Sequence, residues 1–169
     1  MDTTVKLYSL TYKELKTYLL AALFIVGNLL LPQLCHLLPG GGPTWLPIYF
    51  FTLIAAYKYG LRVGLLTAIF SPLINCVLFG MPPVEVLPAI LVKSSFLALA
   101  ASYAAHVSKK NSILAIIAAV LTYQIAGTLI EWAIVGNFFV AIQDFRIGIP
   151  GMLVQVVGGY VLLRAIARL

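Results

Sequence analysis

The stretch YLLAALFIVGNLLLPQLCHLL, residues 18–38, contains 21 residues and no Asp, Glu, Lys or Arg. A run of about 20 apolar residues is long enough to cross the hydrocarbon core of a bilayer as one helix. The rest of the chain has the same character: 62% of its 169 residues are hydrophobic, 9% are charged, and the mean hydropathy is +1.05. Soluble domains carry charge on about a quarter of their residues. The sequence therefore predicts an all-α integral membrane protein.

Six apolar runs follow one another along the chain and predict a single domain, residues 1–169, built as a bundle of six transmembrane helices. The second run is shorter than a membrane span requires, so we expect its neighbours in the bundle to bury it. The runs cover residues 18–38, 45–59, 63–79, 84–107, 113–139 and 147–166.

Basic residues indicate the orientation of the bundle. With the N-terminus in the cytoplasm, the inner loops and tails hold nine of the eleven Lys and Arg residues, and the outer loops hold only Arg146. Because cytoplasmic loops retain Lys and Arg, both termini are predicted to be cytoplasmic. The net charge of +6 is then explained by basic residues at the cytoplasmic membrane surface, so no nucleic acid partner is expected. Residues 1–16 form an amphipathic segment that either lies along the inner membrane face or docks on a partner.

The outer loop after the first run contains three consecutive glycines, Gly40, Gly41 and Gly42. A nucleotide phosphate cradle is excluded here, because the loop lacks cytosolic access and no G-x-x-x-x-G-K-[ST] pattern occurs in the chain. Two interpretations stay open. The loop is either an ordinary surface turn or a mobile lid whose Trp45 packs over a ligand.

Two charged residues lie inside predicted spans, where each costs about 2.5–3.5 kcal/mol on insertion scales. Lys93 and Glu131 lie at a similar depth, about 10 Å below the outer surface, and have opposite charges, which predicts an ion pair. The pair either links two helices structurally or belongs to a ligand site that faces outward. Other polar and aromatic side chains of the same region are candidates to line such a site: Trp45, Asn75, Gln124, Trp132, Asn137 and Gln155.

Catalytic motifs are missing from the sequence. It contains no H-E-x-x-H, no close pair of carboxylates and no Ser–His set at a common depth, so neither an enzyme activity, a metal site nor a cofactor is expected. Cys35 and Cys76 both lie near the predicted outer surface, and a disulfide between them stays open as an alternative.

The segment YGLRVGLLTAIFSPLINCVLFGMPPVEVLPAILVKSSFLAL, residues 59–99, resembles the substrate-binding S-components of energy-coupling factor (ECF) vitamin transporters. The resemblance consists of a glycine pair, a Ser-Pro within the third run, a Gly-Met-Pro-Pro loop and a Leu-Pro that opens the fourth run. The matching residues are Gly60, Gly64, Ser71, Pro72, Gly80, Met81, Pro82, Pro83, Leu87 and Pro88. The last run resembles the closing Pro-Gly-x-x-x-Gln segment of the family through Pro150, Gly151 and Gln155.

The resemblance implies a six-helix bundle in the plasma membrane of a bacterium, with an outward-facing pocket capped by the loops after the first and third runs. It also implies that these loops gate the pocket, through Gly40, Gly41, Gly42, Met81, Pro82 and Pro83. The implied partners are a membrane coupling subunit and two cytoplasmic ATPases. The implied ligand is a small water-soluble vitamin or a related metabolite.

Lys93 departs from the pattern of the family, which often has Glu at this place. We expect Lys93 to neutralise an anionic ligand, and Glu131 either to orient Lys93 or to accept a hydrogen bond from the ligand. Trp45 and Trp132 would stack on the ligand, and Asn75 and Gln155 would supply directional hydrogen bonds. The alternative from another class is a non-transporting scaffold of a cell-wall complex. In a scaffold, Lys93 and Glu131 would bond only to each other.

Overall fold

The computed structural model describes residues 7–167. Within this range the chain is helical and contains no strand. Residues 1–6 of the predicted amphipathic segment lie outside the described residues. The elements in chain order are α1 (Leu15–His36), α2 (Gly41–Trp45), the 3-10 helix η1 (Pro47–Tyr49), α3 (Phe50–Tyr59), α4 (Leu61–Phe79), α5 (Leu87–Ser108), α6 (Ile113–Val135), α7 (Phe138–Ala141), α8 (Gln143–Ile147) and α9 (Ile149–Ala165).

Four of the described helices are long and apolar enough to cross a membrane: α1, α4, α5 and α6. They contain 19 to 23 residues, which corresponds to about 28–35 Å at the rise of an α-helix. The protein is therefore a multi-pass membrane protein. The apolar helix α9 has 17 residues and α3 has 10, so the predicted number of six spans stays a prediction.

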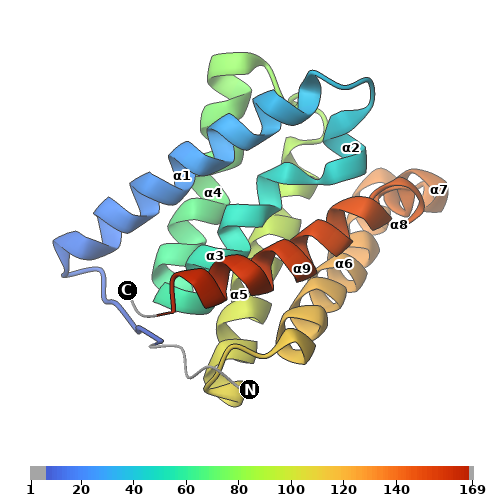
Figure 1. Cartoon of the computed structure of the whole chain (residues 1–169). Coiled ribbons are helices and arrows are strands. Elements are labelled where there is room, and N and C mark those ends of the chain that lie inside the picture. Colours follow the sequence, from blue (N-terminus) through green and yellow to red (C-terminus); the bar gives the residue numbers. More distant parts are fainter. Residues whose placement is uncertain (1–6, 168–169) are drawn as a thin grey trace.

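Helix α3 occupies the centre of the bundle, where it contacts α1, α4, α5 and α9 (Figure 1). Eight of its ten residues are buried. The prediction that neighbouring helices bury the second apolar run is thus confirmed. At about 15 Å this helix is too short to cross a bilayer on its own. The preceding α2 and η1 continue its path toward the end of α1.

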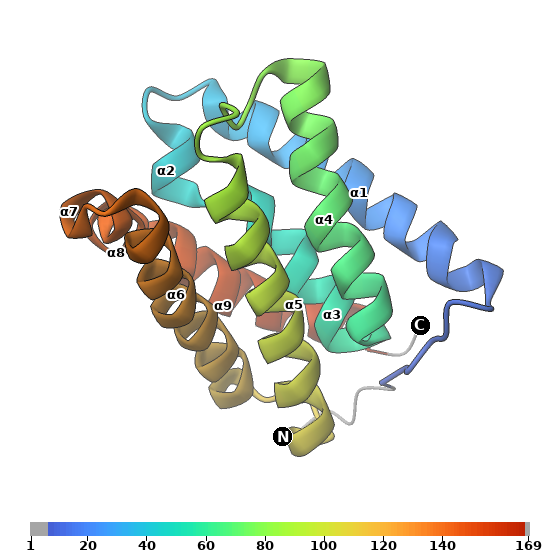
Figure 2. The same cartoon turned by 180° about the vertical axis from the view of Figure 1, so that it is seen from behind.

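The fifth run was predicted to cover residues 113–139, but the helix in the structure is shorter. Helix α6 ends at Val135 because Gly136 follows with a φ of 71°, a left-handed conformation that glycine adopts at little cost. Asn137 then starts α7, and its side-chain oxygen accepts hydrogen bonds from the backbone N–H groups of Phe139 and Val140. As a result, α7 and α8 lie beside the end of α6 instead of extending it (Figure 2).

The opposite end of the bundle, called here the basic end, joins the two ends of the described chain. The N–H of Tyr8 donates to the carbonyl of Lys58 over 2.8 Å, and the ammonium of Lys58 donates to the carbonyl of Ile166. Arg62 donates to the carbonyl of Leu10 over 3.1 Å. Residues 7–11 have no helical structure, so this part of the predicted amphipathic segment is an unwound strap packed against α3 and α4.

A group of buried polar side chains, called here the amide cluster (Asn28, Thr52, Ser71 and Asn75), fixes α1 to α3 and α4. The side-chain amide of Asn28 donates to the hydroxyls of Thr52 and Ser71 over 3.1 and 3.3 Å. Its oxygen accepts from the backbone N–H of Phe51 over 3.1 Å. Polar side chains that bond across helices in this way stabilise membrane bundles.

Candidate functional site

A cavity of about 420 Å³ lies at the end of the bundle opposite the basic end. It is enclosed by the end of α1, the α2–η1 segment, the loop of residues 80–86, the first turns of α5, and the region of α6 to α8. Most of its wall is apolar. Five prolines contribute to the wall, together with aliphatic side chains such as Ile48, Val86 and Ile90: Pro32, Pro43, Pro47, Pro82 and Pro83.

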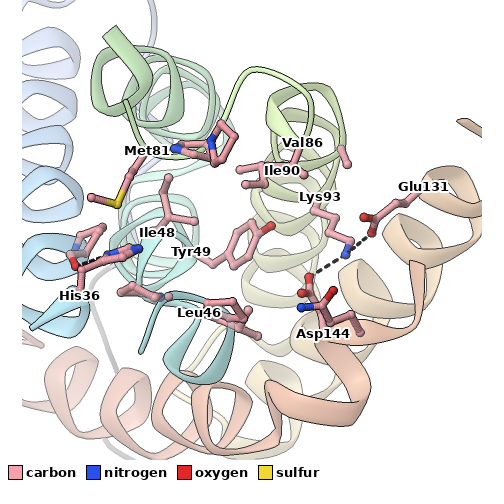
Figure 3. A pocket seen from close by; sticks show the side chains of 18 of the residues that line it. His36, Leu46, Ile48, Tyr49, Met81, Val86, Ile90, Lys93, Glu131 and Asp144 are labelled. Atoms are coloured by element: carbon pink, nitrogen blue, oxygen red, sulfur yellow. Dashed lines mark hydrogen bonds and ion pairs between the residues drawn. The ribbon is translucent and has the colours of Figure 1, made fainter. Parts of the chain in front are cut away.

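One wall of the cavity carries three charged side chains, called here the charge cluster (Lys93, Glu131 and Asp144). The Lys93 Nζ atom lies 2.5 Å from Oε2 of Glu131 and 2.6 Å from Oδ2 of Asp144 (Figure 3). The side chains of Lys93, Glu131 and Asp144 are 3%, 13% and 20% exposed. The cluster thus joins α5, α6 and α8, and its two carboxylates retain contact with the open space of the cavity.

Gly127 on α6 gives Lys93 the room to reach this position. A Cβ atom at Gly127 would lie 2.4 Å from Cγ of Lys93, which is closer than two carbon atoms can approach. A larger side chain at this position would therefore displace the lysine from the cluster. Gly127 therefore lets α5 and α6 approach each other closely, as small residues do in membrane helices.

Three further polar side chains line the cavity, those of Tyr49, His36 and Gln143. Tyr49 extends from η1 between the apolar wall and the charge cluster (Figure 3), and its ring packs against that of Tyr123 with centroids 5.2 Å apart. His36 lies on the far side, where Nδ1 is 2.6 Å from the carbonyl of Pro32. Because a carbonyl only accepts, Nδ1 carries the proton in this contact.

Asn75 and Gln155, predicted to contact the ligand, lie outside the lining of the cavity. Asn75 belongs to the amide cluster and donates to the carbonyl of Asn28 over 2.8 Å. Gln155 accepts from the hydroxyl of Tyr123 over 3.0 Å and donates to the carbonyl of Leu46 over 3.4 Å. Gln155 thereby supports the wall from behind, because Leu46 lines the cavity.

The other four predicted residues also lie away from the cavity lining. Gln124 is fully buried, and its amide has no hydrogen-bond partner among the described residues. Asn137 caps α7. Trp45 and Trp132 are 36% and 45% exposed, and Trp132 packs edge-on against Phe138. Of the eight side chains predicted to bind the ligand, the structure brings Lys93 and Glu131 together at the cavity.

The residues predicted to gate the pocket lie close to the cavity. Gly42, Met81, Pro82 and Pro83 line it. Gly40 adopts a left-handed conformation at the turn, and Gly41 is buried so tightly that a Cβ atom would lie within 1.9 Å of the Cys35 carbonyl oxygen. The loop is thus a packed short helix, and its role as a gate stays a prediction. Cys35 and Cys76 are both free thiols.

Asp144 is the site residue that the sequence analysis missed. Residue 144 falls between the fifth and sixth predicted runs, 113–139 and 147–166, and was not considered for the site. The pair Gly136–Asn137 was the available signal, since glycine commonly ends a helix and asparagine commonly begins one. A turn at this pair brings the chain back over the bundle and places Asp144 against Lys93.

The family model named ECF transporter, substrate-specific component, matches residues 16–167. The chain belongs to this family. No curated protein and no solved structure gives a significant match. As an S-component, the chain is the substrate-binding subunit of a transporter, and the family implies a small-molecule substrate and the protein partners of an ECF module.

Proposed function

We propose that this S-component captures a small water-soluble vitamin, or a related metabolite, in the cavity beside the charge cluster. It takes the ligand from outside a bacterial plasma membrane and delivers it inward with a membrane coupling subunit and two cytoplasmic ATPases. The observation that carries the proposal is the cavity of about 420 Å³. Its size falls within the range of about 300–1,000 Å³ that is typical of small-molecule sites.

The chemistry of the lining supports a ligand with one apolar and one polar side. Prolines and aliphatic side chains form one wall, and Lys93, Glu131 and Asp144 form the other. A ring or alkyl body would pack against the first wall, where its burial is favourable. A polar group of the ligand would meet the charge cluster, which fixes its orientation. Membership of the S-component family favours this proposal over a scaffold without a ligand.

The distribution of charge supports the proposed orientation. The strap at residues 7–11, the end of α3 and the end of α9 meet at the basic end, together with Lys58 and Arg62. The cavity lies at the other end. If the basic end faces the cytoplasm, as the distribution of Lys and Arg predicts, the cavity faces outward. In this proposal α3 with α2 and η1 forms the second span, and α9 the sixth.

The predicted anionic character of the ligand was based on Lys93 beside a single acidic residue. In the structure, Lys93 contacts two carboxylates, those of Glu131 and Asp144. An anionic group could reach Lys93 only beside these two negative charges. The anionic ligand thus stays a prediction, and the cavity gives it little support.

Ligand binding is tested by thermal unfolding of the purified protein in detergent with a panel of vitamins. The panel contains nicotinate, pantothenate, biotin, riboflavin, pyridoxine, pyridoxamine and thiamine. A compound that binds only the folded state stabilises it by about 2.7 kcal/mol at a concentration 100 times its Kd. We expect at least one panel member to raise the melting temperature. No shift with any member would contradict the proposal and favour the scaffold.

A cavity-filling variant shows whether a compound binds in the proposed place. Ala89 on α5 lines the cavity and is 7% exposed, so Ala89→Phe adds a ring that occupies the ligand volume. The matched control is Ala22→Phe, because Ala22 lies on the exposed face of α1. We expect Ala89→Phe to abolish the shift and Ala22→Phe to retain it. A shift that persists in Ala89→Phe would place the binding site elsewhere.

A further inference from the structure

We infer that the ligand of this cavity is a cation, a protonated amine or a positively charged heteroaromatic ring, and that the carboxylates of Glu131 and Asp144 receive its charge. The inference rests on the proposed function, because it concerns the same cavity. It differs from the charge that Lys93 alone would suggest.

The charges on the cavity wall carry the inference. Two acidic side chains and one basic side chain meet there within hydrogen-bonding distance. His36 lies across the cavity and contacts the Pro32 carbonyl, away from the cluster. The formal charges of Lys93, Glu131 and Asp144 sum to −1, and a singly charged cation makes this sum zero. In a partly buried site a neutral set of charges is favoured over a set with excess charge.

The two carboxylates also have the capacity to accept further hydrogen bonds. Each contacts Lys93 through one oxygen, Oε2 of Glu131 and Oδ2 of Asp144. No other residue in the described range donates to Oε1 of Glu131 or Oδ1 of Asp144. An ammonium or amidine group of a ligand would donate to these oxygens. Lys93 acts as a positioning residue, because it holds both carboxylates at the same wall.

The rest of the lining is poor in groups that bind anions. Proteins hold anions with backbone N–H groups and with Arg or Lys side chains. Five of the lining residues are prolines, which have no backbone N–H. Tyr49 and Gln143 add neutral donors, and Lys93 is already in contact with two carboxylates. An anion in this cavity would face more negative than positive charge.

The position of Tyr49 fits a cationic ligand as well. Its ring lies between the apolar wall and the charge cluster (Figure 3). A cationic ring or amine with an apolar body would thus contact the carboxylates, the tyrosine and the prolines at the same time.

The test measures the affinity of wild type and Asp144→Asn for the panel members, which include the cations pyridoxamine and thiamine, the neutral compounds pyridoxine and riboflavin, and the anions nicotinate, pantothenate and biotin. Asn has the shape of Asp without its charge. The control is Glu85→Gln, which removes a negative charge from an exposed residue of the same end that does not line the cavity. Melting temperatures without ligand show that both variants are folded.

We expect a cationic panel member to bind wild type. Asp144→Asn should weaken this binding about tenfold, as for the loss of one charge-assisted hydrogen bond. Glu85→Gln should leave the binding unchanged. Selective binding of a neutral or anionic member, or an affinity for an anion that rises in Asp144→Asn, would overturn the inference and leave the proposed function intact. Absence of binding by every member would contradict the proposed function, and the inference with it.

Discussion

The amide cluster and the charge cluster are both groups of polar side chains enclosed by apolar helices, but they differ in what surrounds them. In the amide cluster, Asn28 bonds to two hydroxyls and a backbone N–H, and all four side chains are at most 1% exposed. In the charge cluster, the side chains of Glu131 and Asp144 are 13% and 20% exposed and border a cavity.

The difference separates a structural role from a binding role. Side chains of the amide cluster fill their space and bond to protein atoms, so nothing else can replace these contacts without opening the bundle. Side chains of the charge cluster bond to one another beside an open volume, so they can exchange partners with a ligand. Polarity inside a membrane bundle therefore indicates a ligand site only where it borders a cavity.

The largest loss of stability is expected for Asn28→Leu. The substitution leaves the N–H of Phe51 and the hydroxyls of Thr52 and Ser71 without their partner in a buried place. We expect a loss of about 3 kcal/mol in the free energy of unfolding, measured by denaturation in detergent. The control Gln33→Leu, on the same helix, removes one bond of 3.4 Å and should cost much less. Loss of vitamin binding by folded Asn28→Leu would break the distinction between the clusters.

A smaller loss, about 2 kcal/mol, is expected for Gly127→Ala, because the added methyl group must displace the stem of Lys93. The loss should vanish in the background of Lys93→Ala, where the atom that clashes is missing. Gly158→Ala is the control, since the nearest atom to its Cβ would be a carbon of the Phe50 ring at 3.2 Å. Equal losses in both backgrounds would show that Lys93 does not pack as described.

Lys93→Met tests how open the charge cluster is. Met keeps the apolar stem against α6 and removes the ammonium that holds Glu131 and Asp144. Because both carboxylates border the cavity and can turn toward water, we expect a loss of about 1 kcal/mol, as for a hydrated ion pair, and not the loss of about 3–5 kcal/mol that follows removal of one partner from a sealed pair. A loss as large as that of Asn28→Leu would instead indicate a sealed structural salt bridge.

The smallest effect, about 1 kcal/mol or less and confined to one region, is expected for Asn137→Ala, which removes the N-cap of α7. Hydrogen exchange should accelerate in α7 and α8 and stay unchanged in α1 and α4. Ser112→Ala removes the corresponding cap of α6 and serves as the control. Access of a ligand to Asp144 would be favoured if α7 and α8 open separately from the rest of the bundle. Uniform acceleration of exchange across the bundle would show that they do not.

Much of the fold was predictable because apolar runs determine where membrane helices form. The starts and ends of α1, α4, α5 and α9 lie within three residues of the predicted runs. The burial of α3 followed from its length. The pairing of Lys93 with Glu131 followed from equal depth and opposite charge, and the two side chains are indeed in contact.

The rest of the site was not predictable because depth along a helix does not give the direction in which a side chain points. Asn75 and Gln155 were predicted to line the site because they lie in the same region as Lys93, but they bond to neighbouring helices instead. Asp144 was missed because its position depends on the turn at Gly136, which reverses the path of the chain after α6.

The most direct measurement of the central claim, that the charge cluster borders a ligand cavity, is native mass spectrometry of the protein purified in mild detergent from cells grown in vitamin-rich medium. We predict a bound small molecule in wild type and in Ala22→Phe, and its absence from Ala89→Phe. A wild-type protein without any bound molecule, or the same molecule retained by Ala89→Phe, would contradict the account.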